Sequence, residues 1–314
     1  MEITVVGHLC KDRILGPAEG TPETVQFGGI MYSVAALAAM ARTGDTIHPV
    51  FGVGAQDLDE VKELLRSLPQ IDPSGIFPVK GTTNEVTLIY GQPGAPRVEC
   101  SSHIADPILL ARIKPYLDTG GILVNMVSGS DITLETLDHI RMNTRDARIP
   151  IHFDFHSLTL GIDPHAKRFR RPLTDWRRWC FMLHSVQMSE DEASGLSAER
   201  YDEQALVNQL MPLMVQAMVI TRGDRGATLI TQDVHKRLTR HDIPPVEVES
   251  VDPTGCGDVF GAAYFSSILA GMDHLEAATR ANAVAALHAS LPARGKLYSI
   301  IERVQTAPPG APQP

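Results

Sequence analysis

The stretch Ser250-Val251-Asp252-Pro253-Thr254-Gly255-Cys256-Gly257-Asp258-Val259-Phe260-Gly261-Ala262-Ala263-Tyr264 carries the strongest structural signal in the sequence. Its glycines predict a tight turn that leads directly into a helix, which we expect over Gly257 to Ala270. Backbone N–H groups converge in such a turn and the helix adds the positive end of its dipole, so an anionic oxygen has a binding site there. Asp258 stands in the first helical turn, where a carboxylate also caps backbone donors. Taken alone, this pattern indicates a capped helix more often than an active site.

On both sides of this stretch, short apolar runs alternate with runs of helical period, which predicts an α/β fold built on a parallel sheet. A fully buried parallel strand is typically short, apolar and bounded by turn residues. The expected strands are Ile3 to Val6, Gly121 to Val127, Ile151 to Phe155, Phe181 to Ser185 and Val215 to Thr221. The other expected helices are Tyr32 to Arg42, Leu58 to Leu68, Leu134 to Met142 and Ala205 to Leu213.

Two segments interrupt the alternation of strands and helices. Residues 76–100 contain Glu85 to Tyr90, a Gly/Pro turn and Pro96 to Cys100, which predicts a β-hairpin. Residues 11–26 form an irregular stretch, and we expect both insertions to make one small β subdomain over the strand ends; ordinary surface loops are the alternative. The hairpin would serve either as a lid or as a dimer clasp. The domain is expected over residues 1–305, with a disordered Pro-rich tail over 306–314.

Composition and charge exclude several classes of protein. Hydrophobic residues make up 43% and charged residues 21% of the 314 residues, which is typical of a globular protein and not of a disordered chain. The net charge of −9 gives no basic footprint for a nucleic-acid partner. No segment reaches the roughly twenty apolar residues of a membrane span, so no membrane partner is expected. The four scattered cysteines favour neither a disulfide framework nor a zinc knuckle, and a reducing cytoplasm is the expected location.

The glycine-rich stretch resembles the signature of the PfkB (ribokinase-like) family of carbohydrate and nucleoside kinases, a D-x-T-G-A-G-D motif followed by an aromatic and small residues. Cys256 stands where alanine is usual. The resemblance implies that Asp258 is the general base that takes the proton from the acceptor hydroxyl. It also implies an anion hole for the transferred phosphoryl group, formed by the N–H groups of Gly255, Cys256 and Gly257. Both roles suit phosphoryl transfer, which needs an aimed hydroxyl and neutralised oxygens. The matching residues are Asp252, Thr254, Gly255, Gly257, Asp258 and Phe260.

Two N-terminal segments resemble the acceptor site of the same family. Gly28 and Gly29 precede a helix of small residues and resemble the di-glycine that lets a sugar or nucleoside approach the backbone. A glycine turn before a packed helix is the alternative. Asp12, shortly after the first strand, resembles the aspartate that binds acceptor hydroxyls. Ser33 stands where ribokinase-like sugar kinases often have asparagine, which does not favour ribose as the acceptor.

Three C-terminal segments resemble the nucleotide site of the family. The segment Val219 to Ala227 places Thr221, Gly223 and Gly226 along the phosphates. Ser189 and Glu192 match an N-x-x-E motif, with serine in place of asparagine, and Glu192 would orient water on magnesium. An alignment shifted to Gln187 and Glu190 is the alternative. Asn282 matches a position that borders the adenine, and an ordinary helix-surface asparagine is its alternative. Relatives also bind a monovalent cation such as potassium near the positions of Asp252 and Thr254.

The pattern His152-x-Asp154-x-His156 is the rival constellation, because such side chains bind zinc or iron. On a continuous strand, however, the two histidines lie about 13 Å apart, too far for one metal ion. Polar residues at the carboxyl end of a central strand instead border the ligand crevice of an α/β protein. Asp154 and His156 are therefore expected beside the phosphoryl or acceptor pocket.

The resemblance implies a three-layer ribokinase-like fold with a mostly parallel central sheet and a small β lid. It implies an ATP-dependent and magnesium-requiring kinase that phosphorylates an alcohol group of a sugar, polyol or nucleoside. The chain contains neither a G-x-x-x-x-G-K-S/T motif nor a G-x-G-x-x-G after the first strand, which excludes two other common phosphate-binding designs. A non-catalytic binding or regulatory protein on the same scaffold is the first alternative, and a metal-dependent hydrolase is the second. Monomer and homodimer both remain open.

Overall fold

The computed structural model describes residues 1–16, 23–91, 98–293 and 295–306, and its central element is a nine-stranded sheet. The strand order is β15-β14-β13-β12-β9-β8-β1-β4-β5, and every pair from β13 to β5 is parallel. β14 and β15 are antiparallel additions at one edge. The expected α/β fold with a mostly parallel sheet is confirmed. The strands are β1 (Glu2–Val6), β4 (Thr46–Gly54), β5 (Ile76–Val79), β8 (Gly121–Asn125), β9 (Ile151–Asp154), β12 (Ser185–Ser189), β13 (Ala217–Thr221), β14 (Ala227–Gln232) and β15 (Leu238–Ile243).

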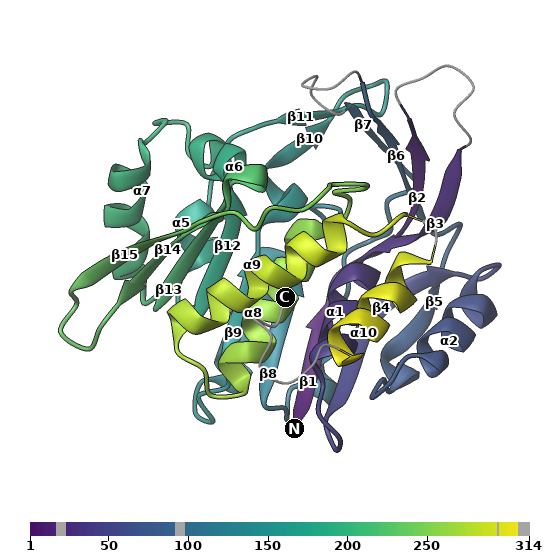
Figure 1. Cartoon of the computed structure of the whole chain (residues 1–314), viewed down its shortest axis with the longest axis horizontal. Helices are drawn as coiled ribbons and strands as arrows, with labels where there is room; N and C mark the ends of the chain where they lie inside the picture. Colours follow the sequence, from purple (N-terminus) through teal and green to yellow (C-terminus); the bar gives the residue numbers. More distant parts are fainter. Residues whose placement is uncertain (17–22, 92–97, 294, 307–314) are drawn as a thin grey trace.

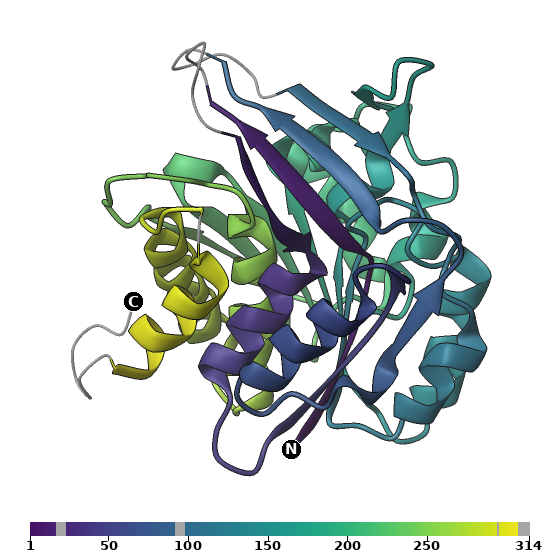
Figure 2. The same ribbon diagram turned by 90° about the vertical axis from the view of Figure 1, so that its right-hand side faces the viewer.

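Helices cover both faces of this sheet. α1, α8, α9 and α10 lie together on one face (Figure 1). The second view separates them from the teal helices of the middle of the chain, which lie on the other side of the strands (Figure 2). The resulting three layers are typical of right-handed βαβ connections. The helices are α1 (Ile30–Met40), α2 (Leu58–Ser67), α3 (Leu110–Ile113), α4 (Leu134–Thr144), α5 (Trp176–Cys180), α6 (Glu190–Gly195), α7 (Glu203–Leu210), α8 (Cys256–Leu269), α9 (His274–Ala289) and α10 (Lys296–Thr306).

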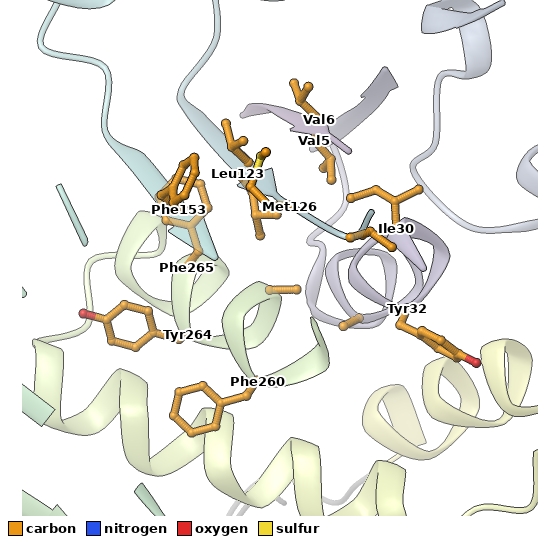
Figure 3. Packing of buried hydrophobic residues seen from close by; sticks show 14 of the residues in the cluster. Val5, Val6, Ile30, Tyr32, Leu123, Met126, Phe153, Phe260, Tyr264 and Phe265 are labelled. Atoms are coloured by element: carbon orange, nitrogen blue, oxygen red, sulfur yellow. The ribbon is translucent and has the colours of Figure 1, made fainter. Parts of the chain in front are cut away.

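The core is densest around α8, which packs between the sheet and the outer helices. Its residues from Asp258 to Ser267 are all buried, because its small and apolar side chains leave no polar face for solvent. Figure 3 shows Phe265 directed toward the sheet and Phe260 directed away from it. Gly121 of β8 allows this approach, since a Cβ there would lie 2.8 Å from side-chain atoms of Leu269 and Phe265. The C-terminal half of α8 thereby packs closely on β8.

A second sheet of four strands projects beyond the carboxyl ends of the central strands (Figures 1 and 2). Its order is β3-β2-β6-β7, and we call it the lid sheet. Both insertions contribute to it, as expected for one small β subdomain, and the described residues of 11–26 include paired parts of β2 and β3. β6 and β7 pair antiparallel as the hairpin requires, while its turn and residues 17–22 lie outside the described residues. The strands are β2 (Leu9–Leu15), β3 (Thr24–Gly29), β6 (Asn84–Ile89) and β7 (Val98–Ser102).

The structure corrects two predictions about strands. The strand expected over Phe181 to Ser185 is wrong, because β12 begins only at Ser185 and Met182 adopts a left-handed φ of 56°. β12 contains polar residues, so it does not stand out as a run of apolar residues. No strand is predicted over the residues of β4, where Pro49 is typical of a strand break. The ladder between β4 and β1 nevertheless continues through Pro49.

Smaller differences concern the ends of elements. The expected helix over 32–42 begins and ends two residues earlier, and α10 extends through Thr306, which was assigned to the tail. Residues 307–314, the rest of that tail, lie outside the described residues. A short antiparallel pair, β10 (Leu160–Ile162) and β11 (Arg168–Arg170), completes the strands of the described part. In that part, no helix combines the length and the apolarity that crossing a bilayer demands.

The burial of Phe265 generates a stability prediction. Its side chain is 0% exposed and stacks on His152, so Phe265→Ala leaves a cavity between α8 and the sheet. We expect a loss of about 3–5 kcal/mol in the free energy of unfolding, measured by urea denaturation. Phe181→Ala is the control, because that ring is 42% exposed, and should cost less than about 1 kcal/mol. Equal losses in the two variants would contradict the packing described here.

Candidate active site

Four neighbouring parallel strands end in a polar residue at the same edge of the sheet. Asn125 is the last residue of β8, Asp154 of β9, Ser189 of β12 and Thr221 of β13. The ladder pairs Asn125 with Asp154 and Ser189 with Thr221, so these side chains form a row. Ligands of open α/β sheets bind at this edge, beyond the carboxyl ends of the strands. The edge therefore defines the candidate site.

The N-terminal end of α8 meets this row. Gly255 caps the helix with a φ of 84°, and a Cβ there would lie 2.5 Å from the ring of Tyr32, so only glycine fits. Asp258 follows in the first turn and is 5% exposed. Asn125 Nδ2 donates to Asp258 Oδ1 at 2.6 Å, and Ser33 Oγ donates to the Asp258 carbonyl at 3.4 Å. The carboxylate is thus aimed by the strand end below it.

Two cavities meet at Asp258. One is a groove of about 380 Å³, and the other is an inner pocket of about 50 Å³ under the lid sheet. His156, Gly255 and Asp258 line both cavities, so a molecule in one faces a molecule in the other across the Asp258 carboxylate. The groove is lined by Asp154, His156, Gln187, Ser189, Glu192, Thr221, Gly223, Pro253, Gly255, Cys256, Gly257 and Asp258. The inner pocket is lined by Cys10, Asp12, Gly29, Tyr32, Val86, Leu88, Glu99, Val127, His156, Thr254, Gly255 and Asp258.

The residues expected to bind the acceptor gather at the inner pocket, with one difference. Asp12 and Gly29 line it, and Tyr32 Oη donates to Asp12 Oδ2 at 2.8 Å. Gly28 lies behind Asp12, where a Cβ would be 1.9 Å from Oδ2, so glycine is required for that carboxylate to fit. Ser33 is buried and does not line the pocket; it accepts from Asn125 Nδ2 at 3.2 Å. Its observed contacts support Asp258 from behind.

The residues expected to bind the nucleotide divide between two places. Ser189, Thr221 and Gly223 line the groove, but Gly226 is absent from its lining. A Cβ on Gly226 would lie 2.1 Å from the Ile243 carbonyl oxygen, so this glycine serves the packing of β14 against the end of β15. Asn282 lies on α9 in a separate apolar cavity of about 830 Å³, where Nδ2 donates to the Pro244 carbonyl at 2.8 Å.

The structure distinguishes the two alignments proposed for the glutamate. Glu192 lines the groove and closes a capping box with Ser189, whose N–H donates to Glu192 Oε2 at 2.8 Å. Glu190 instead pairs with Arg222 and Arg225 at the surface. Gln187 lines the groove but donates to Asp154 Oδ2 at 3.0 Å and to the Gly257 carbonyl at 2.9 Å. Glu192 is therefore the glutamate placed to reach a ligand in the groove.

The three polar residues of the His-x-Asp-x-His pattern separate in space. His152 packs between Tyr264 and Phe265 and bonds Ser185 Oγ at 2.7 Å, and burial lowers its pKa to about 3. Asp154 and His156 face the groove. Within the described ranges, no group of three or more His, Cys, Asp or Glu side chains is arranged to hold a metal ion. The pattern therefore contributes two residues to the site and one to the core.

Electrostatics at the groove are dominated by carboxyl groups. Burial raises the pKa of Asp154 and also that of Glu192. Burial alone would lower the pKa of His156, but the charges of Asp258, Asp154 and Glu192 outweigh it and raise that pKa above its usual value. His156 Nε2 lies 3.7 Å from Asp258 Oδ1. The raised pKa favours the protonated imidazole where the two cavities join.

The predicted monovalent cation does not fit at Asp252 and Thr254. The Nζ group of Lys296 donates to the carbonyl and Oδ2 of Asp252, the latter at 3.1 Å, and to the Thr254 carbonyl at 3.2 Å. These are the oxygen atoms that such a cation would need. The prediction of potassium at this position is corrected accordingly.

One predicted anion-hole donor is already engaged. Cys256 N–H donates to the Pro253 carbonyl at 3.2 Å. The amides of Gly257 and Asp258 lie in the first turn of α8, where no intrahelical carbonyl is available to them. Of the predicted donors, Cys256 N–H is thus directed to Pro253, whereas the Gly257 amide lies in the open first turn together with that of Asp258.

Sequence reasoning missed Asn125, Glu99 and Lys296. Asn125 ends an apolar strand, and a polar residue at that position is the available signal. Glu99 enters the inner pocket from the lid sheet, and Lys296 reaches the glycine turn from α10. Neither of these two has a local pattern that identifies it, because only tertiary packing brings it to the site.

Part of the chain matches a known protein family. The sequence profile described as "pfkB family carbohydrate kinase" matches residues 169–293, which include the glycine turn and Asp258. The resemblance to the PfkB family is confirmed. The chain is 24% identical to the cytidine kinase of Thermococcus kodakarensis over 274 residues, 86% of this chain and 90% of that protein. It is 29% identical over 126 residues to bifunctional protein HldE of Shewanella sediminis, of which the alignment spans 25%.

Solved structures share the fold of this chain. A pyrophosphate-dependent kinase in the ribokinase family, complexed with a pyrophosphate analog and myo-inositol, aligns with a TM-score of 0.72 at 16% identity, over 95% of this chain and 99% of that one. Ribokinase from Thermotoga maritima aligns with a TM-score of 0.69 at 19% identity, over 96% and 99%. Arabidopsis thaliana ribokinase complexed with ribose and ATP gives 0.67 at 18%, over 96% and 98%. These likenesses show the ribokinase-like fold, and the family match supports a sugar or nucleoside kinase.

The cysteine environments generate a prediction about reactivity. Burial raises the pKa of the Cys256 thiol to about 12 and raises the pKa values of the Cys10 and Cys180 thiols. Since the thiolate is the reactive form, we expect these three to resist iodoacetamide at pH 7.5 in the native protein and to react after unfolding. Peptide mass spectrometry reads the outcome, with the half-buried Cys100 as internal comparison. Rapid native alkylation of Cys256, which is half-buried like Cys100, would contradict the raised pKa of its thiol.

Proposed function

We propose that this protein is an ATP-dependent, magnesium-requiring kinase that phosphorylates an alcohol group of a sugar, polyol or nucleoside. The single observation that carries the proposal is the position of Asp258, which lines both cavities. An acceptor in the inner pocket and a phosphoryl donor in the groove would meet at this carboxylate. Phosphoryl transfer depends chiefly on such positioning and on neutralised oxygens.

Asp258 is the proposed general base. The acceptor hydroxyl gives its proton to the Asp258 carboxylate while its oxygen forms a bond to the γ-phosphorus, and the bond from that phosphorus to the β-bridging oxygen breaks to release ADP. Asn125 Nδ2 holds one carboxylate oxygen at 2.6 Å. His156, at 3.7 Å, supplies positive charge beside the transferring group. The first-turn amides of α8 supply donors to its oxygens.

The groove also suits the phosphates of a nucleotide and a magnesium ion. Magnesium is usually held by one or two carboxylates together with substrate phosphates and water, and Glu192 and Asp154 lie in the groove for this purpose. When bound, the ion would neutralise charge on the phosphate oxygens. The observation behind this assignment is the set of buried carboxyl groups along one wall of the groove.

The base of the nucleotide has a suitable cavity along α9. Cys256 Sγ contacts the Ala285 carbonyl at 3.6 Å, and Asn282 is one helical turn away, in the apolar cavity formed with Pro244 and Val246. A nucleotide with its phosphates in the groove would extend toward this cavity. Pyrophosphate has no base to fill it, so the cavity favours ATP as the donor.

The inner pocket favours an uncharged acceptor. Asp12, Glu99 and Asp258 contribute carboxylates to its wall, while Val86 and Leu88 contribute an apolar side. Carboxylates accept hydrogen bonds from hydroxyl or amino groups and repel a phosphate group. A neutral polyol, sugar or nucleoside therefore fits this lining better than a sugar phosphate.

The general-base role predicts the behaviour of Asp258→Asn. The amide keeps the shape but accepts no proton, so kcat should fall by about 10²–10⁴-fold while ATP binding is retained. The assay is ADP release from ATP and magnesium over a panel of pentoses, hexoses, inositols and nucleosides, with pyrophosphate tested separately as donor. Asp146→Asn, at an exposed position after α4, is the matched control and should leave turnover unchanged. Undiminished turnover in Asp258→Asn would rule out Asp258 as the general base. If the wild-type protein binds ATP but turns over none of the acceptors, the non-catalytic alternative is supported.

The contact between Asn125 and Asp258 predicts a second effect. Asn125→Asp replaces the donor with a carboxyl group, and two carboxyl groups in contact raise the pKa of the pair. The base is then deprotonated only at higher pH, so the rise of kcat with pH should move upward. At neutral pH we expect a loss of about 10–100-fold. An unchanged pH profile with full activity would contradict the proposed contact.

A further inference from the structure

The glycine turn before α8 encloses a buried cation that belongs to the chain itself. Lys296 begins α10, its side chain is 0% exposed, and its Nζ group reaches back to the segment that precedes Gly255. It donates to the Asp252 carbonyl, to Asp252 Oδ2 at 3.1 Å and to the Thr254 carbonyl at 3.2 Å. Two backbone carbonyls and one carboxylate therefore surround a single nitrogen.

The geometry requires the charged form of this lysine. Three acceptors need three N–H donors, and only the protonated amine has three. Burial lowers the pKa of Lys296, and the charge of Asp252 opposes that shift. The other donor at this position, His288, is neutral, because burial lowers its pKa to about 3. The positive charge beneath the turn is therefore the ammonium group of Lys296.

The same contacts fix the path of the glycine turn. The Thr254 carbonyl accepts from both Lys296 Nζ and His288 Nε2, the latter at 3.0 Å. Asp252 Oδ1 accepts from Thr254 N–H at 3.0 Å, and Asp252 N–H donates to the Ala289 carbonyl at 3.0 Å. The next peptide leads into Gly255, whose position determines where the first-turn amides of α8 point. Movement of the ammonium would therefore displace the donors that face the groove.

We propose that Lys296 is a tethered internal cation that takes the place of a free monovalent cation and holds the glycine turn in its binding conformation. An ammonium group and a potassium ion carry the same charge and are both satisfied by carbonyl and carboxylate oxygens. Because the lysine is covalently attached, no ion has to be taken from solution. Lys296 acts through the turn and is a positioning residue. The effect on catalysis rests on the proposed function, whereas the effect on cation binding does not.

The first test measures cation binding without any assay of activity. Thermal unfolding of the wild-type protein and of Lys296→Ala is followed in tetramethylammonium, sodium, potassium and ammonium chloride at equal ionic strength. The wild-type Tm should change by less than about 1 °C among the salts. The variant should have a lower Tm, and potassium or ammonium should raise it saturably by at least about 3 °C over tetramethylammonium, because an ion enters the vacated oxygen cage. Lys80→Ala, at an exposed lysine, should respond like the wild type.

The second test measures phosphoryl transfer in the same salts. Wild-type kcat should vary less than about 2-fold, whereas Lys296→Ala should lose at least about 10-fold in tetramethylammonium and regain most of it in potassium or ammonium. A purely structural lysine would give a loss that no salt restores. Wild-type activation by potassium of more than about 5-fold, or a variant that no cation stabilises or activates, would overturn the proposal. If the wild-type protein transfers no phosphoryl group, the proposed function is overturned instead. The unfolding test still decides whether Lys296 takes the place of a monovalent cation.

A neutral pair keeps the proposal testable if Lys296→Ala does not fold in any salt. Lys296→Met with Asp252→Asn removes both charges and retains the volume, and such replacements of buried ion pairs are usually tolerated. We expect this double variant to fold, to show no response of its Tm to potassium, and to lose at least about 10-fold in kcat. Full activity of the double variant, or stabilisation of it by potassium, would refute the internal-cation role.

Discussion

The fixed position of the N-terminal end of α8 is the constraint on which the rest of the site depends. The helix is apolar on every side and is held between the central sheet and the outer helices. Gly121 lets it approach β8, and Gly255 lets its first residue lie against the ring of Tyr32. Because packed interiors deform little, the carboxylate of Asp258 and the first-turn amides have one available location, at the carboxyl edge of the parallel strands.

Charged side chains lie at three places around the site. Buried carboxyl groups of Asp154, Glu192 and Asp258 line the groove, and burial raises the pKa values of Asp154 and Glu192. His156 lies where the two cavities join, and the neighbouring carboxylates raise its pKa. Behind the glycine turn, Lys296 is balanced by Asp252 and directed at backbone oxygens. The first group lines the groove, and the second lies behind the backbone of the glycine turn.

The lid sheet contributes carboxylates to the inner pocket. β2 contributes Asp12 and β7 contributes Glu99, so two of the carboxylates in the inner pocket come from insertions and not from the central sheet. The Asp12 carboxylate in turn depends on Gly28 of the neighbouring strand and on the hydroxyl of Tyr32 from α1. The inner pocket is thus lined by both insertions, α1 and the glycine turn, whereas the groove is lined by strand ends and the glycine turn.

The sequence by itself determined the α/β class, the parallel sheet, the glycine turn into α8 and the presence of Asp258 at its start, because local periodicity and turn chemistry are properties of neighbouring residues. It also identified Asp12, Glu192 and Thr221, which line the two cavities. It did not identify β12, whose polar residues interrupt the apolar run, or β4, which contains a proline. Only the tertiary structure decided that Asn125 aims Asp258, that His152 belongs to the core, and that Lys296 occupies the oxygens assigned to potassium. The reason is physical: these contacts join residues 33 to 133 positions apart, and no local pattern specifies which distant groups the packing of the layers brings together.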